Sequence, residues 1–195
     1  MSAAKALIYR DLTRVMRNKL RIAGTLVRPL LWLVVIGSGY SSIVPTVGKY
    51  PYQTYLMPGL IGMVLLFGSV LCSLTMAIEK ESGSIRLLLV APFSRYWIIV
   101  LRIISSAMIA VVYAFLFISI VLPFNLLPAQ INYPLFCMSI CMTSLLWGAT
   151  GTLIAVLSRG MENFSLIINL VIFPLFFLSG ALYPLNDIPT YMRLV

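Results

Sequence analysis

Residues 79–95, EKESGSIRLLLVAPFSR, form the one long polar interruption between two strongly apolar blocks of the chain. The stretch holds two of the five acidic residues and three of the fourteen basic ones. Gly83 and Pro92 bracket residues 85–91, which are long enough for about two helical turns, and the apolar run within them, 87–90, is too short to span a bilayer. The pattern therefore predicts a short helix outside the membrane core, in a loop joining two membrane spans.

The rest of the chain is apolar enough to lie almost entirely within a membrane. Its 195 residues are 61% hydrophobic and 10% charged, with a mean hydropathy of +1.03, whereas soluble domains are about half apolar and a quarter charged. The apolar blocks are long and continuous rather than alternating, which favours helices over a barrel. The sequence thus predicts an all-α integral membrane protein, a polytopic helical bundle. Five spans are expected, at about 22–44, 54–78, 96–122, 134–157 and 164–183.

Residues 1–21 predict an amphipathic helix that lies in the membrane interface and contacts lipids. Ile8, Leu12, Val15 and Met16 gather on one side of this helix. A row of arginines spaced four, three and four residues apart shares the opposite face. These are Arg10, Arg14, Arg17 and Arg21. A nucleic-acid role is not expected for arginines so close to a membrane span.

The distribution of lysine and arginine predicts the orientation. Twelve of the fourteen basic residues fall in the segment up to Arg28, in residues 79–102 or at Arg159. These three regions, and with them the amino terminus, are expected to be cytoplasmic. A multi-pass protein of the cell membrane is predicted, with a bacterial inner membrane as the expected location.

Small residues recur at helical spacing in two spans. Ser69, Ser73 and Ala77 follow one another every fourth residue in the second span. Gly148 and Thr152, then Gly151 and Ala155, repeat that spacing in the fourth. Such stripes predict that helices approach closely there.

Prolines and a glycine divide the end of the chain. Pro174 lies inside the fifth span and predicts a kink, since proline removes a helical hydrogen bond. Gly180 lies near the end of that span. Residues 181–195 contain Pro184 and Pro189 and are too short and polar to span, so we expect an outer re-entrant region.

The spans lack the groups on which membrane chemistry depends. There is no histidine, and none of the five acids lies in the middle of a predicted span. A proton-coupled carrier is therefore disfavoured, and no catalytic residues, metal site or cofactor are expected in this chain. Any uphill transport would need energy from another subunit. The three cysteines are expected to pack among apolar side chains. They are Cys72, Cys137 and Cys141.

Two further polar residues have competing interpretations. Arg102 lies just inside the third span, and we expect it to snorkel towards the interface. The alternative is contact with an anionic substrate head group. Asn169 is the one amide deep in the fifth span, and we expect it to bind a neighbouring helix rather than a substrate.

The central stretch resembles the cytoplasmic loop of type-2 ABC exporter permeases. The residues that carry the resemblance are Glu81, Gly83, Ser84, Leu88, Leu89, Pro92, Ser94 and Arg95. A second match, SGALYP at 179–184 with Ile188 and Pro189, resembles the outer end of that family's fifth span. The resemblance covers essentially the whole chain.

The resemblance implies a permease subunit that works with a separate cytoplasmic ATPase, on which ATP and Mg²⁺ would bind. Glu79 and the matched loop residues would contact that ATPase, which would push on the loop as a rigid body. It also implies a second permease copy, outward movement of an amphipathic or lipid-linked substrate, and a sixth span that this chain, with five, does not reach. The alternative from another class is a membrane scaffold that binds a cytoplasmic partner without transport.

Overall fold

The computed structural model describes residues 3–42, 45–47, 50–83, 95–127 and 131–180. Within these ranges, five helices are long and apolar enough to cross a membrane, which confirms the predicted all-α polytopic bundle. The first four are α2 (Lys19–Ser41), α3 (Tyr52–Glu81), α5 (Arg95–Val121) and α6 (Tyr133–Leu157). The fifth combines α7 (Met161–Ile167), the π-helical η2 (Ile168–Ile172) and α8 (Phe173–Leu178).

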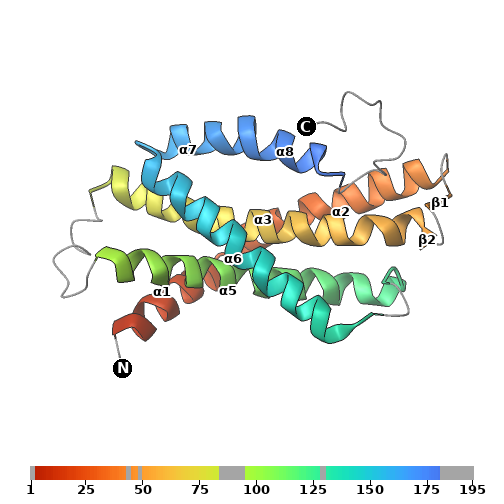
Figure 1. Cartoon of the computed structure of the whole chain (residues 1–195), viewed down its shortest axis with the longest axis horizontal. Coiled ribbons are helices and arrows are strands. Elements are labelled where there is room, and N and C mark those ends of the chain that lie inside the picture. The colour runs from red at the N-terminus through yellow and green to blue at the C-terminus, as the bar shows by residue number, and fades with distance from the viewer. Residues whose placement is uncertain (1–2, 43–44, 48–49, 84–94, 128–130, 181–195) are drawn as a thin grey trace.

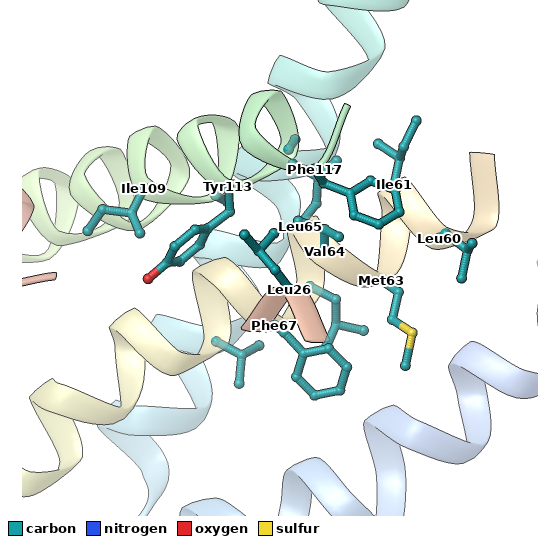
Figure 2. Close-up of a cluster of buried hydrophobic side chains, with 14 of the residues drawn as sticks. Leu26, Leu60, Ile61, Met63, Val64, Leu65, Phe67, Ile109, Tyr113 and Phe117 are labelled. Carbon is teal, nitrogen blue, oxygen red and sulfur yellow. The ribbon is translucent and has the colours of Figure 1, made fainter. Parts of the chain in front are cut away.

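Helix α3 is the centre of the bundle, and α2, α5, α6 and α7 all pack against it (Figure 1). The most apolar stretch of α3 is largely buried, and its buried share is far higher than that of the corresponding stretch in each of the other four spans found. Figure 2 shows the core at its middle, where Leu26 of α2 and Tyr113 and Phe117 of α5 converge on α3. A helix that is hydrophobic all round is expected in such a central place.

The small residues mark the closest helix contacts. A Cβ atom added to Gly68 of α3 would lie 2.8 Å from the Tyr113 ring of α5. One added to Gly151 of α6 would lie 2.8 Å from the Ser73 hydroxyl oxygen of α3. These contacts confirm that the stripe through Ser73 and the glycines of the fourth span allow close packing.

The amino-terminal helix is shorter than expected. Helix α1 covers Ala3–Arg17, and α2 begins at Lys19, where the sequence predicted one helix to residue 21. The break occurs because the Asn18 side chain accepts a hydrogen bond from the Arg21 backbone N–H, 3.1 Å away, and so caps α2. Helix α1 packs against α5. Val15, on its predicted apolar face, is buried, but Met16 is exposed.

Short irregular elements join the spans. Strands β1 (Thr46–Val47) and β2 (Tyr50–Pro51) pair antiparallel after α2. A 3-10 turn, η1 (Leu122–Phe124), extends α5. The second span is longer than expected at both ends, so that Glu79 and Glu81 belong to α3 and not to a loop.

The fifth span is interrupted where the sequence places Pro174. The π-helical turn η2 ends at Ile172, and Pro174 is the second residue of α8. A proline cannot donate to the carbonyl four residues earlier, and a π turn relieves both the missing bond and the clash. Gly180 has a φ of +71°, the left-handed conformation common just after a helix end. Pro184 and Pro189, with the expected re-entrant region, lie outside the described residues.

Candidate functional site at the charged end of the bundle

Six charged side chains meet at one end of the bundle, on the left in Figure 1, and we call this region the charged end. It contains Arg10, Asp11, Glu79, Lys80, Glu81 and Arg102. They come from α1, from the last turn of α3 and from α5. The charged end therefore joins elements that are far apart in the sequence.

A buried ion-pair cluster holds α1, α3 and α5 together. Arg102 donates to Asp11 Oδ2 at 3.2 Å and also to Glu79 Oε2. Arg10 lies 3.1 Å from Asp11 Oδ1 and 3.7 Å from Glu79 Oε1. The side chains of Arg102, Asp11 and Glu79 are 5%, 4% and 13% exposed, and that of Arg10 is 47% exposed. Among the described side chains, two guanidinium groups thus balance two carboxylates, as burial of charge requires.

The next residue of α3, Lys80, binds the end of α6. Its ammonium donates to the backbone oxygens of Val156 and Ser158, at 2.7 and 2.8 Å. Carbonyl groups in the last turn of a helix lack partners within the helix and carry partial negative charge. Lys80 satisfies two of them and complements the dipole of α6.

Glu81 binds the opposite kind of helix end. The Met161 backbone N–H, at the start of α7, donates to Glu81 Oε2 at 3.0 Å. A carboxylate at a helix amino terminus both accepts from a free N–H and complements the dipole. A Cβ added to Gly160 would lie 3.2 Å from the same oxygen, so the loop approaches Glu81 closely. Glu81 therefore caps the start of α7.

The structure describes only part of the predicted coupling stretch. Glu79 and Glu81 end α3 as described above, and Gly83 follows with a φ of +72°, which favours glycine. Arg95 is the first residue of α5. Ser84, Leu88, Leu89 and Pro92 lie outside the described residues.

The predicted snorkelling of Arg102 is wrong. Its guanidinium turns into the bundle because two carboxylates are available there, one of them on α1. Sequence reasoning also missed Asp11 as its partner, Arg10 as the second cation of the cluster and Lys80 as a cap. A signal was present: Asp11 is the one acid among the arginines of α1, and Arg102 is a cation inside a span, so each needed a partner.

The three cysteines lie in different environments. Cys72 is buried as expected, whereas Cys137 and Cys141 are exposed on α6 and do not pack within the described part of this chain. Among the described residues, no group of three or more histidine, cysteine or acidic side chains is placed to hold a metal ion. The charged end can transmit force, because its elements are bonded to one another.

Comparisons with known proteins agree on one family. The model of the family described as ABC-2 type transporter matches residues 2–195. The inner membrane transport permease YadH of Escherichia coli K12 is 26% identical over 199 residues, which cover 98% of this chain and 75% of YadH. No solved structure gives a significant match.

Two further relatives have similar names. The ycf38 protein of Cyanophora paradoxa, named as a transport permease, is 26% identical over 200 residues, covering 97% of this chain and 67% of its own length. The inner membrane transport permease YhhJ of Escherichia coli K12 is 25% identical over 135 residues. That match covers 69% of this chain but only 36% of YhhJ.

Proposed function

The chain belongs to the ABC-2 type transporter family and is a permease subunit of an ABC transporter; we propose that it exports an amphipathic or lipid-linked substrate, powered by a separate ATPase subunit. ATP and Mg²⁺ bind to that ATPase and not to this chain. A second copy of the permease completes the transporter, as the family resemblance implies. The membrane is a bacterial inner membrane, and the charged end faces the cytoplasm.

The observation that carries this proposal is the bonding at the charged end. Residues 82–94 connect α3 to α5, and both helices are fixed at that end by Glu79 and Arg102. Lys80 and Glu81 extend the same attachment to α6 and α7. A push on the connecting residues therefore reaches four spans and α1 together, which is what coupling by rigid-body motion requires.

The proposed docking site can be tested by stoichiometric co-purification. The tagged full chain is purified from membranes of its native host, and bound proteins are identified by mass spectrometry. An ATPase with a phosphate-binding loop is expected in equal amount. Leu88→Asp should abolish the association, because a charge replaces an apolar contact in the segment proposed to dock.

A matched control makes the result specific. Leu122→Asp introduces the same charge at the opposite end of the bundle, on an exposed residue of η1, and should leave the association intact. Absence of any ATPase with the unmodified chain, or equal binding by Leu88→Asp, would refute the proposal. A partner without ATPase activity would instead favour a membrane scaffold.

Orientation needs its own measurement. Single cysteines replace exposed Arg159 and Tyr50 in a chain whose native cysteines are changed to serine. In intact spheroplasts, a membrane-impermeant maleimide should label the cysteine at 50 and not the one at 159. Labelling of position 159 alone would reverse the proposed orientation.

A further inference from the structure

Arg28 lies far from either end of the bundle. It follows the start of α2 by nine residues, about 14 Å along a helix. Its guanidinium lies over Phe67, 4.5 Å from the ring centroid, and Phe67 is the sixteenth of the thirty residues of α3. A cation at this depth is costly in a membrane and commonly marks a functional site.

Among the described residues, Arg28 contacts aromatic rings and no acidic side chain. The guanidinium is 5.6 Å from the Phe173 ring centroid as well as above Phe67, so two aromatic faces support it. None of the ion pairs among the described residues includes Arg28. Asp11 and Glu79 already pair with Arg102.

Among the described residues, the remaining acids of a second copy of this chain do not lie at that depth. Glu81 and Glu162 lie at the charged end, in the last turn of α3 and the first turn of α7. Glu162 precedes Phe173 by eleven residues, about 16 Å along the span. Asp187 lies outside the described residues. Within the described residues, the positive charge of Arg28 is therefore not matched by a carboxylate.

A cavity adjoins this charge. It has a volume of about 190 Å³ and lies between α2, α3 and the α7–η2 segment. Its polar lining consists of Arg28, Ser165, Asn169 and Thr25. The Thr25 hydroxyl already donates a hydrogen bond to the Arg21 carbonyl. Neither Ser165 nor Asn169 makes a side-chain hydrogen bond to another described residue, so the expected contact of Asn169 with a neighbouring helix is not found there.

We propose that this cavity binds the phosphate head group of an anionic amphiphile. The Arg28 guanidinium would donate two parallel hydrogen bonds to phosphate oxygens, and the Asn169 amide and Ser165 hydroxyl would donate to the others. Phe164, Leu71 and the rest of the apolar lining would contact the first carbons of the amphiphile's hydrocarbon chain. Pockets for drug-sized ligands are about 300–1,000 Å³, so this smaller cavity suits a head group.

This site is independent of the direction of transport and of the ATPase. Its ligand is either a membrane phospholipid or a free phosphate compound, since both present the same anionic oxygens. The purified full chain is titrated with phosphatidylglycerol or phosphatidylcholine, and bound lipid is counted by native mass spectrometry. A parallel titration adds millimolar inorganic phosphate to distinguish the two sources.

Phosphatidylglycerol should bind more tightly than phosphatidylcholine. Arg28→Gln should weaken its binding at least about tenfold, the usual effect of losing a charged hydrogen-bond partner. Asn169→Leu should weaken it less, and Arg28→Lys should lie between wild type and Arg28→Gln. The matched control Arg159→Gln removes an exposed charge and should change binding less than about twofold.

The outcomes separate cleanly. Competition by inorganic phosphate that needs Arg28 identifies a free anion, and its absence identifies a lipid head group. Equal affinity for both lipids, or equal binding by Arg28→Gln and wild type, would overturn the proposal. If Arg28→Gln does not fold, Asn169→Leu and Arg28→Lys decide instead. These variants should still co-purify with the ATPase. Loss of lipid binding alone would then concern this site and not the proposed function.

Discussion

Removing Arg102 tests whether the charged end holds the bundle together. Arg102→Gln takes from Asp11 and Glu79, both largely buried, the buried guanidinium that pairs with them, and Arg10, which also contacts both, is half-exposed. The cluster changes from two positive and two negative charges to one positive and two negative. Breaking a buried ion pair costs about 3–5 kcal/mol, and we expect the lower end because Arg10 can move towards the carboxylates.

The assay is thermal unfolding of the purified full chain in detergent. For a chain of this size, about 3 kcal/mol corresponds to a fall in melting temperature of roughly 6–12 °C. The triple variant Arg102→Gln, Asp11→Asn, Glu79→Gln also removes the two carboxylate charges and should recover most of that loss. The melting temperature of the triple variant is compared with that of Arg102→Gln, measured in the same detergent.

Two results would refute this reasoning. A melting temperature that changes by less than about 2 °C in Arg102→Gln would mean that the pairs contribute little. Equal instability of the single and triple variants would mean that the shape of Arg102 matters and its charge does not. A double-mutant cycle between Asp11 and Arg102 then measures what remains of their coupling.

Three further predictions concern helix contacts. Gly148→Ala should destabilise the bundle by about 1–3 kcal/mol in thermal unfolding, because its Cβ would lie 2.7 Å from the Ser106 hydroxyl; Gly39→Ala, with open space around it, is the neutral control. Lys80→Met should cost about 0.5–1.5 kcal/mol and speed hydrogen exchange at the end of α6, whereas an unchanged exchange rate would contradict the cap. Glu81→Ala should speed exchange at the start of α7, with a loss of about 1 kcal/mol, while Glu81→Gln retains an acceptor and should show a smaller effect.

The spans were predictable because each is a long apolar block, and that property is local. Their ends were less predictable. Asn18 divides α1 from α2 through one side-chain bond, although an asparagine before a helical run is a recognisable cap. Residues 79–81 appeared to be loop because they are charged, yet they continue α3 since each has a partner.

The candidate site was only partly predictable for the same reason. Glu79 and Glu81 stood out by composition, but their roles depend on partners from other helices. The Asp11–Arg102 pair spans 91 residues, and no local pattern reports such a contact. Arg28 was counted with the cytoplasmic basic residues although it falls within the expected first span, and its two aromatic supports come from α3 and α8. The π turn before Pro174 likewise reflects how the packed helix absorbs the proline.

The order of charges at the end of α3 matters as much as their number. Glu79, Lys80 and Glu81 point about 100° apart around the helix axis, and each meets a partner of opposite sign. Exchanging Lys80 with Glu81 would leave net charge, hydropathy and the bias of basic residues untouched. It would nevertheless set a carboxylate against carbonyl oxygens and an ammonium against an N–H. Two chains of identical composition can therefore differ in whether their helices assemble, and an algorithm that counts charges would not distinguish them.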